Sequence, residues 1–416
     1  MKKRSLAGLI AAAGALLSLT ACGSGSDGAA LPTCKQLDPA QTWYGTNKET
    51  LSTFIATTGT CGKNTATKPL ALFDWDNTLV KNDAGEATFY WLLSHDKLLQ
   101  PTDWSATSPY LTPTAGDALR AACGTAVPGT PLPTSTNTAC ADEILAIGDN
   151  GKTKSGASAF DGYDHRRLEP AYAWQVQLLA GHTPAELTDY ATQARAQNLA
   201  APEGTEQTIG TTKVDGWVRY YPQQQDLVKT LQANGFDVRI VTASAEPVIK
   251  VWSPELGVPA DKVIGIVPLT DHDTYTGHIA GCGGLGPDQV ITYMEGKRCA
   301  INERIFAITG PTAFDQQPPA NRPALAAGDS DTDVVFVADA TTLHLVINRN
   351  KPELMCHAYA NPDGKWLINP MFITPKKHKD QPYPCATTGF TTATGDHKPL
   401  TGPNGTVVPD QQDTVY

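Results

Sequence analysis

The sequence has 416 residues, which is long enough for one large hydrophobic core and an inserted second region. Acidic residues outnumber basic ones by 42 to 32, so the formal net charge is −10. The one basic cluster is the Lys-Lys-His-Lys run at residues 376–379. Nucleic-acid binding is therefore not expected, because proteins that bind nucleic acids carry an extended basic face.

The chain begins like an exported protein. Three basic residues precede an apolar run over residues 6–19, which is too short for a typical membrane-spanning helix and matches a secretory signal. The string Leu19-Thr20-Ala21-Cys22 resembles a bacterial lipoprotein cleavage box. We predict a signal peptide at residues 1–22, lipidation at Cys22 and a flexible tether at residues 23–33. The alternative is plain secretion with an incidental cysteine.

These features predict a protein anchored by lipid to the bacterial cell envelope, on its periplasmic or extracellular face. Setting Cys22 aside leaves eight of the nine cysteines, an even number that suggests disulfides in an exported chain. We expect four sequential pairs, although the sequence alone does not fix connectivity: Cys34–Cys61, Cys123–Cys140, Cys282–Cys299 and Cys356–Cys385. No CxxC motif occurs, which argues against a zinc site.

Residues 34–68 predict an N-terminal extension with a helix near residues 48–56. The apolar run at residues 70–73 predicts a buried strand, and the string Asp74-Trp75-Asp76-Asn77-Thr78 follows it directly. Residues two apart on a strand point the same way, so the two carboxylates converge and require a cation. Mg²⁺ suits such a site, because it binds a few carboxylates together with substrate phosphate oxygens. The alternative is an ordinary turn, which these residue types also form.

Roughly 155 residues separate this loop from the next predicted strand, far more than a βα connection needs. We therefore predict a mainly helical cap inserted at residues 86–235. Residues 101–137 are rich in Thr, Ser and Pro and are expected to be mostly loop. The helices of this region are expected near residues 86–99, 141–147, 171–179, 184–197 and 223–234.

The chain is expected to return to the core at residues 236–373, with strands near 238–242, 263–266, 324–327 and 343–347. Strands that alternate with helices favour a parallel sheet, so the predicted fold is α/β with a Rossmann-like core formed by residues 34–85 and 236–373. Residues 374–416 show little periodicity and predict a loop-rich tail that wraps the surface, tied by Cys385.

Three further segments place reactive groups near strand ends. Thr242 ends the second strand, and its hydroxyl suits a phosphoryl oxygen, although a plain helix cap explains it as well. Lys297 offers a fixed positive charge, although an isolated lysine is usually solvated. Asp329 and Asp333 follow the third strand and could complete and support a Mg²⁺ site, although an acidic turn is the alternative.

These motifs follow one another in a fixed order: a DxDxT string, a threonine, a lysine and a GDxxxD string. In this order the chain resembles, over residues 70–350, the haloacid-dehalogenase superfamily of phosphatases and phosphotransferases. That resemblance implies the corresponding fold and assigns roles. Asp74 would be the nucleophile and Asp76 the general acid/base, while Thr242 and Lys297 would bind phosphate. One departure is Thr332, where many relatives of the phosphoserine-phosphatase type carry Asn. The implied metal site comprises Asp74, Asp76, Asp329 and Asp333.

The same chemistry follows from the residues themselves. Asp74 would attack phosphorus in line and form an aspartyl phosphate. Asp76 would protonate the leaving oxygen and later take a proton from water. Mg²⁺ and Lys297 would offset the negative charge. The second acid, Asp76, favours hydrolysis or transfer to an oxygen, because both reactions need a group that moves a proton. A dehalogenase would not need this second acid.

The predicted cap begins with acids and aromatics that suit a cationic headgroup, above all a quaternary ammonium. The aromatics could equally be cap core. The strings Asp-x-Asp-Asn-Thr, Tyr221-Pro222 and Thr242-Ala243-Ser244-Ala245-Glu246-Pro247 are similar to exported phosphorylcholine phosphatases. Asp83 stands where phosphoserine-phosphatase relatives place an acid toward the substrate amine. The expected substrate-binding residues are Asn77, Thr78, Asp83, Glu86, Tyr90, Trp91, Ala243 and Ser244.

The leading hypothesis is thus a Mg²⁺-dependent phosphomonoesterase acting on phosphocholine or a similar small cationic phosphoester. A second hypothesis is a broad-specificity exported acid phosphatase for nucleotides or sugar phosphates. A third is a lipoprotein that binds choline-type or phosphate ligands without turnover. The sequence disfavours it, because the expected catalytic and metal-binding residues are all present: Asp74, Asp76, Lys297 and Asp329. The expected partners are a small phosphoester and the membrane; the oligomeric state is not predicted.

Overall fold

The computed structural model describes residues 33–416 except 64 and 66. The predicted signal peptide, the lipidated Cys22 and all but the last residue of the tether lie outside the described residues. Among the described residues, no helix is both long enough and apolar enough to cross a membrane.

A six-stranded parallel sheet forms the centre of the fold, in the order β12-β11-β10-β1-β6-β7. This confirms the predicted α/β class with a parallel sheet. The short strands are wholly buried apolar runs, as parallel strands covered on both faces should be. The strands are β1 (Leu70–Phe73), β6 (Asp237–Ala245), β7 (Val263–Ile266), β10 (Leu325–Gly328), β11 (Leu343–Asn348) and β12 (Trp366–Pro370).

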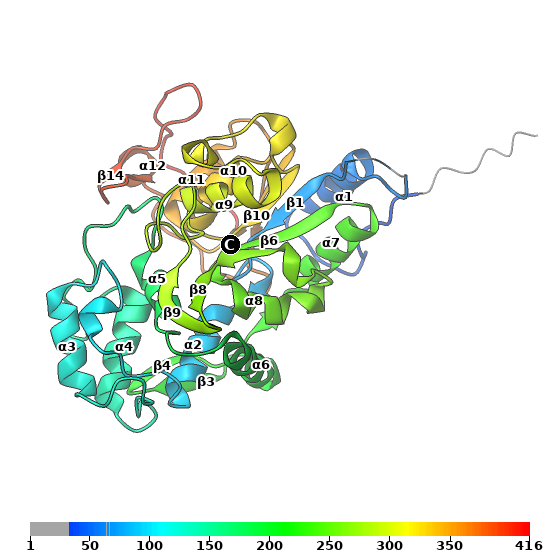
Figure 1. The fold of residues 1–416 in the computed structure, drawn as a ribbon. Helices are drawn as coiled ribbons and strands as arrows, with labels where there is room; N and C mark the ends of the chain where they lie inside the picture. The colour runs from blue at the N-terminus through cyan, green and yellow to red at the C-terminus, as the bar shows by residue number, and fades with distance from the viewer. Residues whose placement is uncertain (1–32, 64, 66) are drawn as a thin grey trace, which may run out of the picture. The chain divides into compact units, whose positions relative to one another are not determined.

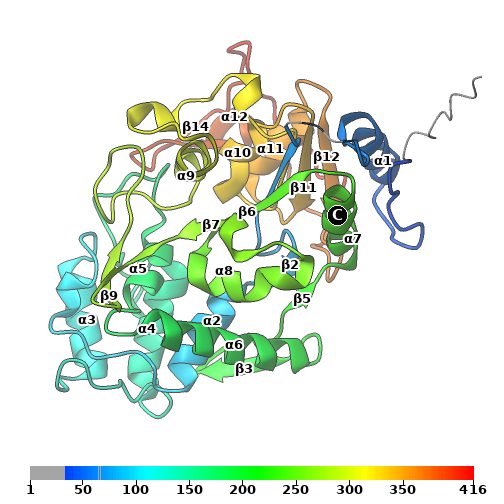
Figure 2. The same cartoon turned by 45° about the vertical axis from the view of Figure 1, so that its right-hand side comes forward.

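Helices cover both faces of this sheet, because alternate residues of each strand face opposite sides. Ala71 and Phe73 of β1 belong to one apolar cluster with residues of α1 (Asn47–Thr58) and α7 (Pro222–Ala233). Leu72 belongs to a second cluster with residues of α9, α10 and α11. Figure 2 shows the same division, with α7 and α9 on opposite sides of the strands. These three helices are α9 (Glu295–Phe306), α10 (Val334–Ala338) and α11 (Pro352–Ala360).

The long segment between β1 and β6 is mainly helical, as expected, and its helices lie together at one end of the molecule (Figure 1). They are α2 (Ala84–Ser94), α3 (Pro113–Cys123), α4 (Thr138–Asn150), α5 (Pro170–Gln177) and α6 (Pro184–Ala200). Residues Cys34–Tyr416 form one compact unit, so the boundaries of a separate cap stay a prediction.

Residues 101–137 are mostly loop, as predicted, but they contain one α-helix, α3, that was not predicted. The Thr and Pro that suggested a loop begin this helix: the Thr112 side chain accepts a hydrogen bond from the Ala115 amide, and Pro113 occupies the first turn. Two hairpins were also not predicted. They consist of β3 (Glu206–Ile209) with β4 (Thr212–Asp215), and β8 (Pro268–Asp271) with β9 (Thr274–Ile279).

The remaining elements are short. Strand β2 (Val80–Lys81) pairs with β5 (Arg219–Tyr220), and the tail forms α12 (Cys385–Thr388), β13 (Phe390–Thr391) and β14 (His397–Lys398). Six 3-10 turns, η1–η6, complete the described elements: Trp104–Ala106, Ser253–Leu256, Ala260–Lys262, Pro311–Phe314, Pro319–Asn321 and Asp331–Asp333.

Within the part of the chain that the structure describes there are four disulfides, and they are the four predicted sequential pairs. Cys356–Cys385 ties the tail to α11, as the sequence suggested. The tail nevertheless does more than wrap the surface, because Tyr383 and Asp413 are buried against the core. Disulfides on this scale are typical of proteins that fold in an oxidising compartment outside the cytoplasm.

Candidate active site

The predicted reactive segments meet at one edge of the sheet. Strands β1, β6, β10 and β11 are parallel neighbours, so their carboxyl ends lie side by side, the usual place for a ligand in open α/β sheets. Asp74 follows β1 and Asp329 follows β10, and the Asp74 amide donates to the carbonyl of Ala327 at 2.9 Å. Segments that are far apart in the sequence therefore lie next to each other at this edge of the sheet.

Asp74 is buried and held by hydrogen bonds from both sides. Lys297 Nζ donates to Oδ1 at 2.8 Å, and Thr78 Oγ1 donates to Oδ2 at 2.9 Å. Thr78 also lies 3.3 Å from Asp329 Oδ1, so its hydroxyl joins the two carboxylates. Burial, followed by the charge of Asp333, raises the pKa of Asp74 well above its usual range. Lys297 acts against both effects, through its charge and its hydrogen bond, and lowers this pKa.

Lys297 lies in the first turn of α9 and is completely buried. Its Nζ donates to Asp333 Oδ1 at 2.6 Å as well as to Asp74. Burial opposes its charge, but the carboxylates of Asp333 and Asp74 outweigh that effect and raise the pKa of Lys297. The predicted lysine is thus a fixed cation behind the proposed nucleophile.

Asp333 acts as a brace in this arrangement. Its Oδ2 accepts hydrogen bonds from the backbone amides of Asp329 at 3.0 Å and Ser330 at 3.1 Å. Its Oδ1 accepts from Lys297 and, at 2.9 Å, from Thr332 Oγ1. The departure at Thr332 therefore still supplies a donor to Asp333. Gly328 allows this close packing, since a Cβ there would lie 2.7 Å from the Asp333 carboxyl carbon.

Three buried carboxylates, those of Asp74, Asp329 and Asp333, have oxygens within 4.8 Å of one another and could hold a metal ion. The donor set fits Mg²⁺, which prefers hard oxygen ligands. Both Asp333 oxygens already accept two hydrogen bonds each, so Asp74 and Asp329 are the better ligands and Asp333 is their support. The Asp76 carboxylate, which was also predicted as a ligand, is not part of this cluster, so its place at the metal stays a prediction.

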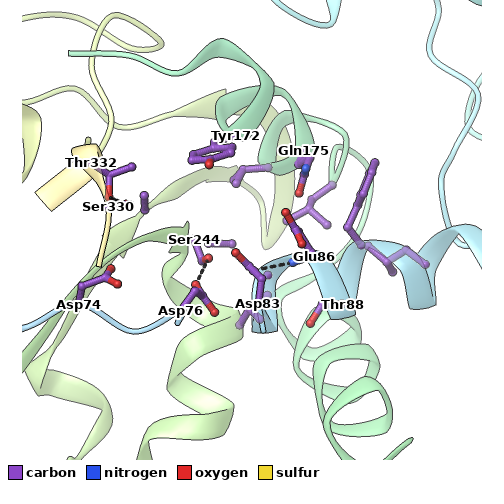
Figure 3. A pocket seen from close by; sticks show the side chains of 18 of the residues that line it. Asp74, Asp76, Asp83, Glu86, Thr88, Tyr172, Gln175, Ser244, Ser330 and Thr332 are labelled. Carbon is purple, nitrogen blue, oxygen red and sulfur yellow. Dashed lines mark hydrogen bonds between the residues drawn. The ribbon is translucent and has the colours of Figure 1, made fainter. Parts of the chain in front are cut away.

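Asp76 lies instead at the N-terminus of α2. Its Oδ1 accepts from the Ala84 amide at 2.7 Å, and its Oδ2 accepts from Ser244 Oγ at 2.7 Å (Figure 3). Burial, followed by the charges of Asp83 and Asp74, raises the pKa of Asp76 well above its usual range. A carboxyl group that keeps its proton in this way is suited to protonate a leaving oxygen.

The strand that carries Thr242 runs further than predicted and changes which residue meets the cavity. Thr242 is completely buried, and its Oγ1 accepts a hydrogen bond from the Ser244 amide at 3.1 Å. Ala243 and Ser244 line the cavity, whereas Thr242 lies behind them. The side chain of Thr242 is thus placed to hold this turn, and the phosphate contact that the sequence assigned to it stays a prediction.

A cavity opens from Asp74 and Asp76 toward the helices of the inserted segment (Figure 3). Its polar wall includes Asp83, Glu86 and Tyr172. Its apolar wall comes from α2, α5, α6 and α8 (Glu246–Trp252), together with the residues just after α5. The apolar lining residues are Phe89, Leu92, Val176, Leu179, Leu187 and Val248.

Two aromatics predicted to bind substrate are not in this lining. Tyr90 directs its hydroxyl to Asp149 Oδ2 at 3.0 Å, and the Trp91 ring stacks on His95 with ring centroids 4.0 Å apart. Both are core residues of the helical segment, the alternative that the sequence left open. Asn77 is also away from the cavity and accepts a hydrogen bond from the Asn82 amide at 3.2 Å.

Six polar residues of the lining were not among the predicted site residues: Thr88, Tyr172, Gln175, Ser330, Thr332 and Arg349. Arg349 directly follows β11, and its Nη1 donates to Asp329 Oδ2 at 3.0 Å. The rule that strand ends carry the site could have found it, since a strand was predicted at residues 343–347.

Glu86 gives the cavity a testable pH dependence. Burial, followed by the charges of Asp83 and Asp149, raises the pKa of Glu86 to about 8. The folded protein therefore keeps a proton on Glu86 that the unfolded chain releases above pH 4.5, the ordinary pKa of Glu, so stability falls as the pH rises between these values.

We expect Glu86→Gln to become more stable than the wild type across this window, by about 1–3 kcal/mol at the upper end. Urea unfolding from about pH 5 to about pH 8 measures the difference. Glu49→Gln, on the exposed side of α1, is the matched control and should show a flat difference. A flat difference for Glu86→Gln as well would contradict the buried, protonated carboxyl.

Comparison with known proteins gives information about the fold. No family model and no curated protein matches the chain. A protein of unknown function from Anaerococcus prevotii is 19% identical over 81% of this chain and 94% of its own, with a TM-score of 0.56. A substrate-bound phosphoserine phosphatase matches 70% of this chain and 90% of its own at 12% identity and a TM-score of 0.33. A phospho-aspartyl intermediate analogue of phosphoserine phosphatase matches 73% and 92% at 13% identity, also with a TM-score of 0.33.

The likeness to the Anaerococcus prevotii protein shows a shared fold over most of both chains. None of these likenesses bears on the activity or the substrate. The chain therefore has an α/β fold with a six-stranded parallel sheet and a buried cluster of three aspartates at its carboxyl edge.

Proposed function

We propose that this protein is a Mg²⁺-dependent phosphomonoesterase that works through an aspartyl-phosphate intermediate. The observation that carries the proposal is the environment of Asp74. This buried carboxylate is held by Lys297 and Thr78 and lies next to Asp329. A second acid, Asp76, lines the same cavity and is held separately, by Ser244. One carboxylate is thus held for attack, and the other is held for proton transfer.

The reaction follows from these positions. An Asp74 oxygen attacks phosphorus, and the bond from phosphorus to the leaving oxygen breaks while Asp76 gives that oxygen its proton. Asp76, now ionised, takes a proton from a water molecule that attacks the phosphorus of the aspartyl phosphate. Phosphate leaves, and both carboxyl groups return to their starting states. Mg²⁺ bound by Asp74 and Asp329 would offset the negative charge of the nucleophile and the phosphoryl group.

Phosphocholine or a similar small cationic phosphoester is the substrate that the leaving-group side of the cavity suits best. Asp83 and Glu86 line it beside the ring of Tyr172 and an apolar wall. Burial raises the pKa of both acids, so each gains from a positive charge placed next to it. Acidic groups beside aromatic and apolar surface favour an alkylammonium headgroup over a neutral sugar.

We also propose that the protein is exported and anchored by lipid at Cys22. The four disulfides support a location outside the cytoplasm, and the lipoprotein-like string Leu19-Thr20-Ala21-Cys22 supports the anchor. Mass spectrometry of the mature N-terminus tests the anchor directly, since a diacylglyceryl group on Cys22 is expected, and an unmodified N-terminus would contradict it.

A substrate panel tests the proposed function. The purified protein with Mg²⁺ is offered phosphocholine, phosphoethanolamine, phosphoserine, a nucleoside monophosphate and a sugar phosphate, and the released phosphate is measured. We expect release to be concentrated on the cationic esters and to be lost with a chelator. Even release across the panel would support a broad-specificity phosphatase and reject the cationic substrate. Phosphate binding without release from any ester would favour the non-catalytic alternative.

A further inference from the structure

The cavity has an unusual balance of charge for a site that takes a phosphate dianion. Among the described residues, its lining contains five acids and a single basic side chain, that of Arg349. The acids are Asp74, Asp76, Asp83, Glu86 and Asp329. Lys297 is not part of this lining, because it is completely buried behind Asp74 with its ammonium group between two carboxylates. An entering phosphoryl group thus meets Arg349 as the cation on the cavity surface.

The guanidinium of Arg349 is held in place but keeps donors to spare. Its Nη1 donates to Asp329 Oδ2 at 3.0 Å, which uses one of its five N–H groups. The side chain is 31% exposed, whereas that of its partner Asp329 is 1% exposed. Among the described residues the guanidinium makes no other hydrogen bond, and Arg349 lines the cavity, so its remaining N–H groups can meet oxygen atoms there.

The backbone on both sides of Arg349 is fixed by the C-terminal tail. Asn348 Nδ2 donates to Asp413 Oδ1 at 3.0 Å, and Tyr383 Oη donates to Asn350 Oδ1 at 2.7 Å. Asn348, Tyr383 and Asp413 are buried and Asn350 is half-buried, although the tail lies far along the chain from the other site segments. The tail therefore holds the turn that carries Arg349. Because this turn is already ordered, a ligand that binds Arg349 loses little free energy to ordering it.

We propose that Arg349 is a phosphoryl-binding residue that donates two hydrogen bonds to non-bridging oxygens of the substrate phosphate while it stays paired with Asp329. This inference rests on the proposed function and adds a binding residue to that site. A planar guanidinium matches two oxygens of a phosphate at once, which a lysine ammonium does not.

The charge balance supports this role. Asp74, Asp329 and Asp333 carry three negative charges when ionised, and Lys297 and Arg349 supply two positive ones. A divalent cation makes this group of charges net positive, which suits a dianion, and removal of Arg349 makes it neutral. Loss of Arg349 should therefore weaken the binding of every phosphoester, whatever its leaving group.

The test uses inorganic phosphate as the probe, because phosphate binding does not require turnover. Calorimetry with Mg²⁺ present measures the Kd of phosphate for the wild type, Arg349→Gln and Arg349→Lys. We expect the glutamine variant to bind phosphate about 10- to 100-fold more weakly, and the lysine variant to fall between the two. Lys351→Gln is the matched control, since it removes the same charge two residues away, lies outside the cavity lining and makes no side-chain cap contact.

A Mg²⁺ titration of the same proteins separates binding from positioning. If Arg349 only orients Asp329, the Kd of Mg²⁺ rises in the glutamine variant and the Kd of phosphate at saturating Mg²⁺ does not change, which would overturn the proposal. Equal loss of phosphate binding in Lys351→Gln would also overturn it, because a general charge effect would then explain both. If the wild type binds phosphate through Arg349 but hydrolyses no ester, the proposed function fails while this inference stands.

Discussion

Replacing Asp74 by Asn should reduce phosphate release by at least about 10⁴-fold, because an amide cannot form the acyl phosphate. The substitution keeps the shape of the side chain and leaves an oxygen to accept the hydrogen bond from Lys297 or Thr78. The fold is therefore expected to survive. Initial rates at saturating Mg²⁺, alongside near-ultraviolet circular dichroism of both proteins, measure the two effects separately.

The matched control is Asp363→Asn, which changes a carboxylate to an amide near β12 and away from the cavity. This variant should keep the wild-type rate. Activity that persists in a folded Asp74→Asn protein would exclude covalent catalysis by this residue, and a broader search for a nucleophile would then be needed.

Replacing Lys297 by Met should be the most destabilising change at the site. The substitution leaves the carboxylates of Asp74 and Asp333 buried without their shared cation. Removal of one partner of a buried ion pair costs about 3–5 kcal/mol, and we expect the free energy of unfolding in urea to fall by this amount. Phosphate release should fall with it, because the nucleophile is no longer held in its ionised state.

A double variant separates the loss of charge from the loss of packing. Lys297→Met combined with Asp333→Asn removes one positive and one negative charge, so it should recover part of the stability without recovering activity. A single Lys297→Met variant as stable as the wild type would contradict the buried ion network. Unfolding is measured with a chelator present, so that bound metal does not mask the difference, and phosphate release is measured with Mg²⁺ present.

Much of this architecture could be predicted from local sequence patterns. Strand β7 was predicted at its observed residues because it is a short, continuously apolar run. Asp74, Asp76 and Asp329 could be predicted together because strand ends in an α/β fold converge on one edge of the sheet. Lys297 lies in the first turn of α9 rather than at a strand end, and only its order in the chain among the other motifs pointed to it. The disulfide pairs were predictable because each joins cysteines close in sequence, the longest separation being 29 residues.

The site residues that were predicted at the wrong place, or not at all, owe their positions to tertiary packing, which local sequence patterns do not show. Helix α2 is buried on nearly every side, so the sequence could not show that Phe89 faces the cavity while Trp91 stacks on His95. Strand β6 continues to Ala245 with an irregular register against β7, which moves Ser244 rather than Thr242 to the cavity. Arg349 was missed because a lone arginine after a strand is most often a solvated residue.

The central claim is that phosphate passes through a covalent bond to Asp74, and trapping that bond tests it most directly. The protein is mixed with Mg²⁺ and isotopically labelled phosphocholine, quenched in acid within the first turnover, digested and analysed by mass spectrometry. We predict labelled phosphate on the peptide that contains Asp74, and its disappearance in Asp74→Asn. Rapid release of phosphate with no label on that peptide would contradict the account, since water would then attack the substrate directly.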